Sequence, residues 1–190
     1  MPDADVRPVV ETDFPAIAEL TNEFVRGTAI HFGYEPVTAA ELLTGWRRGV
    51  DRYPWLVAEV DGSFAGYAKA GVWRERAAYG WTVETGIYLR SPHRGRGVAR
   101  ILYERLIELL RRQGFRSIVA GVTLPNPASV ALHERIGFVP VGVVRAAGFK
   151  LGRWHDVGFW QLELSDAPSP AAIRSPADTW AEVRSDRRPD

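Results

Sequence analysis

The 190-residue sequence contains no cysteine, so it can form neither a disulfide nor a thiolate metal site. Its four histidines, His31, His93, His133 and His155, lack the spacing of metal ligands, and we expect no metal. The absence of cysteine is compatible with a reducing compartment, and we expect a cytoplasmic protein.

The sequence also lacks any apolar run of transmembrane length, and its first five residues, MPDAD, do not resemble a signal peptide. Its net charge is only +1, which provides no general basic field for nucleic acid or an anionic membrane. We therefore expect no nucleic-acid partner and no membrane partner.

The length and an ordinary composition, 46% hydrophobic and 25% charged, predict a single domain with one core. We place that domain at residues 1–164. Residues 165–190 are dominated by Pro, Ala, Ser, Asp and Arg, which predicts a poorly ordered tail that could dock through Ile173 or Trp180.

The most informative stretch runs through residues 82–114 and predicts a strand, a turn and a helix. Residues 82–89 are rich in β-branched and aromatic side chains. From Val98 onward the apolar residues recur every three or four positions, which indicates one buried helix face, and Gly114 suits the left-handed position that ends a helix.

The turn between this strand and helix has the sequence HRGRGVA, residues 93–99. Two glycines without Cβ atoms, the unpaired first amides of a helix and nearby arginines favour binding of a phosphate or pyrophosphate. A solvated βα turn is the alternative. A dinucleotide fold would need a third glycine where Arg100 stands, and a P-loop would need a Gly-Lys-Ser/Thr sequence.

The remaining segments predict helices on the faces of a mixed sheet, an α/β (α+β) class. Thr12 is expected to cap a first helix, and Thr38 with Glu41 forms a capping box for a second. Asp61-Gly62 joins two strands in a hairpin. After a strand at 117–122 come a short helix that begins after Asn126 and strands at 138–144 and 155–164, giving the order β-α-α-β-β-β-α-β-α-β-β.

The segment R-G-x-G-x-A after a strand resembles the pyrophosphate-binding signature of the GNAT superfamily of acyl-CoA-dependent N-acetyltransferases. Four further blocks look like the phosphinothricin N-acetyltransferases: DRYPWLVAEV (51–60), WTVE (81–84), LPNPASVALHE (124–134) and WHDVGFWQ (154–161). The resemblance covers about residues 5–164. It implies the GNAT fold, acetyl-CoA as co-substrate, a homodimer, and acetylation of the α-amine of phosphinothricin, methionine sulfoximine or methionine sulfone.

The resemblance also implies roles for individual residues. Glu84, in the W-T-V-E block, would be the general base, although by itself it could be a surface glutamate on a strand. His133 stands where the phosphinothricin enzymes have a histidine and many relatives a tyrosine; it would be catalytic or would orient the substrate, with a structural role as the alternative. The cofactor would contact backbone and side chains at Ile87, Tyr88, Leu89, Arg94, Gly95, Arg96, Gly97, Val98, Ala99, Arg100, Asn126 and Ser129.

An amino-acid substrate also needs a cation for its carboxylate and an apolar wall. The candidates for substrate binding are Phe32, Arg74, Arg76, Tyr79 and Thr85, with solvated loop positions as the alternative for the arginines. Two other functions remain open. One is acetylation of a protein or peptide N-terminus or another small amine, and the other is a CoA-binding module without catalysis.

Overall fold

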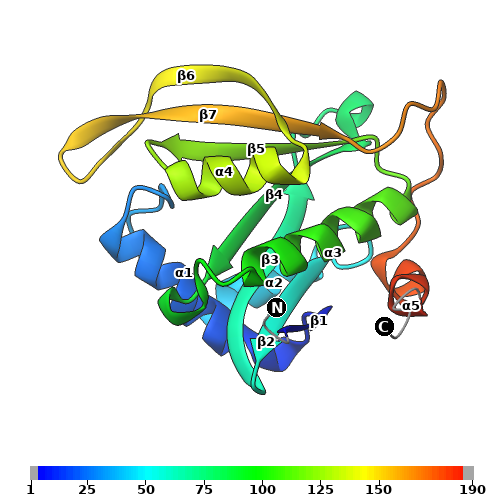
Figure 1. Ribbon diagram of the computed structural model, residues 1–190, viewed down its shortest axis with the longest axis horizontal. Helices are drawn as coiled ribbons and strands as arrows, with labels where there is room; N and C mark the ends of the chain where they lie inside the picture. Colours follow the sequence, from blue (N-terminus) through cyan, green and yellow to red (C-terminus); the bar gives the residue numbers. More distant parts are fainter. Residues whose placement is uncertain (1–3, 186–190) are drawn as a thin grey trace.

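Seven strands form one mixed sheet in a computed structural model that describes residues 4–185 (Figure 1). Their order across the sheet is β1-β2-β3-β4-β5-β7-β6, in which only β4 and β5 run parallel. The strands are β1 (Ala4–Pro8), β2 (Trp55–Val60), β3 (Ser63–Val72), β4 (Thr82–Leu89), β5 (Ser117–Leu124), β6 (Val139–Lys150) and β7 (Arg153–Glu163).

Helices cover both faces of this sheet, as the sequence predicts. They are α1 (Phe14–Gly27), α2 (Ala39–Arg47), α3 (Val98–Gln113), α4 (Pro127–Ile136) and α5 (Pro176–Ser185). The α1 side chains Phe14, Ile17 and Leu20 share a buried cluster with Val57 and Tyr67 of the sheet, and α2 residues pack against the same cluster.

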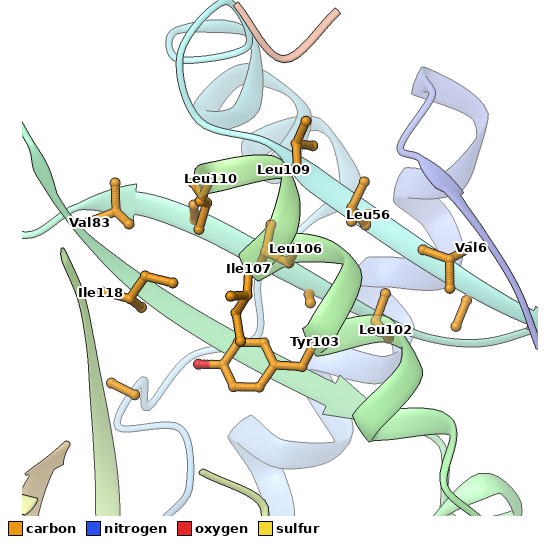
Figure 2. Close-up of a cluster of buried hydrophobic side chains, with 14 of the residues drawn as sticks. Val6, Leu56, Val83, Leu102, Tyr103, Leu106, Ile107, Leu109, Leu110 and Ile118 are labelled. Atoms are coloured by element: carbon orange, nitrogen blue, oxygen red, sulfur yellow. The ribbon is translucent and has the colours of Figure 1, made fainter. Parts of the chain in front are cut away.

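Helix α3 packs on the opposite face and supplies the larger core. Leu102, Leu106, Leu109 and Leu110 are at most 1% exposed. Figure 2 shows them against side chains of the strands, including Leu56, Val83 and Ile118. Burial of a leucine stabilises the fold by about 1.5–3 kcal/mol relative to leaving it exposed, so this stripe fixes α3, and with it the turn at its start, against the sheet.

Local signals in the sequence are confirmed at several turns and caps. Asp61 and Gly62 both have positive φ, 52° and 70°, as a two-residue hairpin turn requires. The capping box of α2 is present: the Glu41 amide donates to Thr38 Oγ1 at 3.2 Å, and the Thr38 amide donates to Glu41 Oε2 at 2.7 Å. Gly114 ends α3 in the left-handed region.

The central strands β4 and β5 pair only over a short length. Their register runs from Thr82 opposite Ser117 to Glu84 opposite Val119 and ends there. Beyond Glu84 the two strands diverge, which Figure 1 shows clearly. Among residues 4–185, no strand therefore pairs with the β5-side edge of β4 at residues 85–89, while the other edge stays paired to β3.

The structure differs from the sequence-based expectations in the length of β6, which runs to Lys150, at the start of α1 and in the tail. Thr12 does not cap α1: Asp13 occupies the cap position, and its carboxylate accepts hydrogen bonds from Arg7 and from the Val10 amide. The tail is ordered through residue 185, because Pro176–Ser185 forms α5, in which Thr179 and Val183 are at most 1% exposed. Ile173 and Trp180 pack against the α3 core, while residues 186–190 lie outside the described part.

No helix within residues 4–185 is both long enough and apolar enough to cross a membrane.

Candidate active site

A cavity of about 640 Å³ opens on the face of the sheet that carries α1 and α2. One wall is the loop after α1, with Ile30, His31 and Phe32, and another is the end of α2, with Trp46 and Arg48. The floor comes from strands β2, β3, β4, β5 and β7. Its residues include Trp55, Lys69, Gly71, Glu84, Gly86, Tyr88, Gly121, Thr123, Val157 and Phe159.

Glu84 stands on this floor at the last paired position of β4, where β4 and β5 diverge. Glycines flank it on both neighbouring strands: Gly71 is its partner on β3, and a Cβ at Gly121 on β5 would lie in contact with Glu84 Oε1, at 3.7 Å. The side chain reaches solvent through the cavity, while the walls remove enough water to raise the pKa of the carboxyl. The charges of Arg74 and Lys69 oppose that rise.

Lys69 and Tyr88 also belong to the cavity, and the sequence-based list contained Tyr88 only for cofactor binding. The Lys69 ammonium lies 4.9 Å from the centroid of the Trp55 ring. The Tyr88 ring stacks on Tyr67 at 5.2 Å, and burial together with the Glu84 charge raises the pKa of its phenol to about 12. The sequence does contain a signal that could have identified Lys69: it follows Tyr67 by two residues on one strand, and residues two apart on a strand point to the same face.

Thr85, an expected substrate residue, borders the cavity but turns its hydroxyl away from it. Neighbouring residues of a strand point to opposite faces, so Thr85 faces α3 while Glu84 faces the cavity. Its hydroxyl lies 2.6 Å from the Tyr103 hydroxyl of α3, in a buried position. Only the backbone of Thr85 can contribute to the cavity.

His133 belongs to the same buried network and lies away from Glu84. Its Nδ1 contacts the Ser129 carbonyl at 2.7 Å and its Nε2 the Tyr103 hydroxyl at 3.2 Å. A carbonyl only accepts, so Nδ1 carries the proton and Nε2 accepts from Tyr103. Burial lowers the pKa of the ring, consistent with the neutral form. These contacts join α4 to α3, and His133 is not among the residues that line the Glu84 cavity.

The turn before α3 has the geometry of an anion site. Gly95 and Gly97 have φ of 70° and 88°, and no atom lies within 4 Å of where a Gly95 Cβ would be. The first hydrogen bonds of the helix come from the amides of Arg100 and Ile101 to the Gly97 carbonyl, so the Val98 and Ala99 amides precede the helical ladder. These features fit a pyrophosphate.

The arginines of the turn differ in their surroundings. Arg94 donates from Nε to the Leu89 carbonyl at 2.9 Å and lies over the Phe24 ring, which ties the turn to β4 and α1. Arg100 pairs with Glu104 at 2.7 Å on the exposed side of α3. Arg96 is exposed.

Two other expected cofactor residues have internal roles. Asn126 caps α4, since its Oδ1 accepts from the Ser129 amide at 3.2 Å, and the Ser129 carbonyl holds His133.

Ile87, Tyr88 and Leu89 lie on the edge of β4 that has diverged from β5, where a ligand could pair with the backbone.

The expected substrate residues separate into two groups. Phe32 lines the cavity. Arg74 lies near enough for its charge to oppose the rise in the Glu84 pKa, and its guanidinium is 4.3 Å from the centroid of the Trp73 ring. Arg76 and Tyr79 lie outside the cavity wall, on the exposed link between β3 and β4. The link is irregular, so sequence periodicity could not orient its side chains. Among residues 4–185, no cluster of three or more His, Asp or Glu side chains could hold a metal ion.

Diverging central strands, a glycine-rich helix start and a cavity carboxylate suit a phosphate-bearing acyl donor and an amine acceptor, as in an acyl-group transferase. Residues 15–138 match the family model described as the acetyltransferase (GNAT) family, so the chain belongs to that family.

Within the family, the chain is similar to amino-acid acetyltransferases. It is 43% identical over 170 residues to a phosphinothricin N-acetyltransferase of Streptomyces viridochromogenes, covering 90% of this chain and 93% of that one. It is 37% identical over 163 residues to an L-methionine sulfoximine/L-methionine sulfone acetyltransferase of Salmonella typhimurium, covering 85% and 95%. A phosphinothricin acetyltransferase of Sinorhizobium meliloti, solved in complex with AcCoA, superposes with a TM-score of 0.85 at 34% identity, covering 88% and 93%.

Proposed function

We propose that this chain is an N-acetyltransferase that transfers an acetyl group from acetyl-CoA to the α-amine of phosphinothricin or of similar amino acids such as methionine sulfoximine and methionine sulfone. The observation that carries the proposal is the Glu84 carboxylate in the cavity, at the point where β4 and β5 diverge. The named activities of the similar proteins support the substrate class.

Acetyl-CoA supplies the acetyl group as an activated thioester. The residues that would hold it are the turn at Gly95–Gly97, with the first amides of α3 for its pyrophosphate, and the free edge of β4 at residues 87–89 for its pantetheine arm. A backbone amide on that edge, which we assign to Ile87, would donate to the thioester carbonyl and stabilise the negative charge that develops there.

Glu84 prepares the nucleophile. The substrate amine is an ammonium ion near neutral pH and must lose a proton before it can attack a carbonyl carbon. Burial raises the pKa of Glu84, which makes its carboxylate a better proton acceptor than a solvated glutamate. The Arg74 and Lys69 charges keep the carboxylate form accessible.

The test of Glu84 is the variant Glu84→Gln. We expect turnover to fall about 10²- to 10⁴-fold, the range for loss of a general base, with little change in acetyl-CoA affinity measured by calorimetry. Because the pKa of Glu84 is raised in the folded protein, its ionised carboxylate destabilises the folded state at pH values above the ordinary glutamate pKa. Glu84→Gln removes this cost, so it should unfold at a temperature no lower than the parent chain. Unchanged turnover would remove Glu84 from the mechanism.

The pyrophosphate site has a matched pair of variants. Gly95 and Gly62 both have φ of 70° and no atom within 4 Å of a Cβ position, but Gly62 lies in the β2–β3 hairpin turn. Both Gly95→Trp and Gly62→Trp carry the same backbone strain. We expect only Gly95→Trp to weaken acetyl-CoA binding, by more than about tenfold. Equal effects of the two variants would place the cofactor elsewhere.

We also propose that the chain forms a homodimer through the β6–β7 hairpin. Strand β6 is an edge of the sheet, and its valines at 139, 141, 143 and 144 are 52–58% exposed. Phe149, Leu151 and Trp154 extend the apolar surface to the hairpin end at 47–65% exposure. A long exposed apolar edge favours pairing with a second copy. Sedimentation should give a dimer that Val143→Lys dissociates, and a monomeric parent would refute this.

A further inference from the structure

Lys69 is a cavity cation for which the proposed chemistry gives no contact with the substrate; Arg48, at the end of α2, is another charged residue of the wall. It lies on β3 opposite Gly86, and Glu84 is two residues before Gly86 on β4. The two residues are therefore diagonal neighbours on one face of the sheet, with Cα atoms about 7–8 Å apart by the usual geometry of such pairs. Both side chains line the same cavity.

The surroundings hold the Lys69 stem and leave its ammonium available. The stem passes over Gly86, where a Cβ would lie 3.9 Å from Lys69 Cε, and the ammonium lies over the Trp55 ring. Burial lowers the pKa of the Lys69 ammonium, and the negative charge of Glu84 opposes that shift. The Lys69 charge in turn helps to lower the pKa of the neighbouring His31 imidazole. The other lysine of the chain, Lys150, differs: its ammonium donates to the Val25 and His31 carbonyls at 2.5 and 2.6 Å.

A cationic side chain and an anionic side chain on neighbouring strands match the head group of a free amino acid. Its amine and its carboxylate are bonded to the same carbon and carry opposite charges near neutral pH. If the amine approaches Glu84, as the proposed function requires, the carboxylate on the same carbon lies on the side of Lys69.

We propose that Lys69 binds the α-carboxylate of the substrate while Glu84 receives its α-amine. The inference rests on the proposed function and narrows its substrate class. It predicts that the enzyme selects free amino acids over peptide N-termini, amino-acid amides and simple amines, because none of these has an α-carboxylate to offer the Lys69 ammonium.

The test compares one substrate with its uncharged partner. Methionine sulfone and methionine sulfone carboxamide differ only in the α-carboxyl group, and each is assayed with the parent chain, Lys69→Met and Lys69→Arg. Methionine has nearly the length of lysine and should pack on Trp55 without the charge.

We expect the parent chain to prefer the acid in kcat/KM by about 10- to 100-fold, the usual effect of one charge-assisted hydrogen bond. Lys69→Met should lose that preference, because KM should rise much more for the acid than for the carboxamide. The loss of the Lys69 charge beside Glu84 should lower kcat on both substrates to the same extent. Lys69→Arg should restore part of it. Thermal unfolding of each variant checks that the fold is retained.

Other outcomes would overturn the inference. An equal loss on both substrates, with a shifted pH profile, would mean that Lys69 acts on Glu84 and not on the carboxylate. An unchanged preference in Lys69→Met would exclude any contact. If the parent chain turns over neither compound, the proposed function is wrong, but the inference about Lys69 is still tested. Calorimetry would then compare the binding of the acid and of the carboxamide to the parent chain and to Lys69→Met, and equal binding of the two compounds would refute the inference.

Discussion

Gly148 of β6 touches the wall of the cavity, and a single methyl group there should change substrate binding. A Cβ at Gly148 would lie 2.3 Å from Phe32 Cε2 and 2.7 Å from two further atoms of the ring. The same end of β6 holds the loop that carries Phe32 in two other ways. The Tyr34 hydroxyl donates to the Phe149 carbonyl, and the Lys150 ammonium donates to the His31 carbonyl.

The size of the effect follows from these distances. Carbon atoms in contact lie about 3.5–4.0 Å apart, so in Gly148→Ala the Phe32 ring must move away by about 1.2–1.7 Å. Overpacking of this kind costs about 1–3 kcal/mol in a tight core, and Phe32 is only half-buried, so we expect the lower end, about 1 kcal/mol. Displacement of an apolar wall of the site should raise KM for the amino acid about five- to tenfold.

The assay is the release of free CoA at varied methionine sulfone and at varied acetyl-CoA. KM for the amino acid should rise and KM for acetyl-CoA should stay the same. Gly27→Ala is the control, because no atom lies within 4 Å of its Cβ position at the end of α1. Gly148→Ala combined with Phe32→Ala removes the clash, so the two effects should not add. Additive effects, or an unchanged KM in Gly148→Ala, would refute the argued contact.

Three further outcomes test the site and the fold. Tyr103→Phe should lower the free energy of unfolding by about 1–3 kcal/mol in a denaturant titration, because Thr85 and His133 lose their buried partner; a neutral result would mean the network has no energetic role. On acidification, kcat/KM should begin to fall at a pH above the ordinary glutamate pKa of about 4.3, because Glu84 must be deprotonated to act and its pKa is raised. Lys69 and Arg74 are the charged neighbours that oppose this rise, and a kcat/KM that stays constant down to about pH 4.3 would contradict the prediction. Val183→Ala should destabilise the chain by about 1–3 kcal/mol in thermal unfolding, as expected for a residue of α5 that is 1% exposed, and no change would separate α5 from the core.

The sequence predicts the parts of the fold that local signals determine. The helix of residues 98–113 has a continuous apolar stripe and a terminal glycine, and the Asp61-Gly62 hairpin has a dedicated turn, so both were found with nearly the observed bounds. Strand β6 extends to Lys150, six residues beyond the expected end, because its pairing with β7 is set by tertiary contacts and not by its own periodicity.

The candidate site was predicted less completely for the same physical reason. Glu84 and Phe32 meet in one cavity as expected. Strand alternation gives the face on which Lys69 lies, but its place beside Glu84 depends on the register between β3 and β4, which no local pattern gives. Arg76 could not be oriented, because its link has no periodic structure. Strand alternation, which the sequence does show, turns the Thr85 side chain to the face opposite that of Glu84.

The tail shows how composition can mislead. Residues 165–185 have few apolar side chains, which favoured disorder. Those few are nevertheless spaced so that Trp180 and Val183 of α5 pack on the core beside α3. A short helix with two well-placed apolar residues needs a surface to dock on, and that surface is known only from the fold.

The most direct test of the account is the release of free CoA by the full chain with acetyl-CoA and a panel of amines: phosphinothricin, methionine sulfone, methionine sulfoximine and a mixture of peptides. The account predicts turnover on the three amino acids, little on the peptides, and loss of turnover in Glu84→Gln. Turnover on peptides alone, or equal turnover by the parent chain and Glu84→Gln, would contradict it.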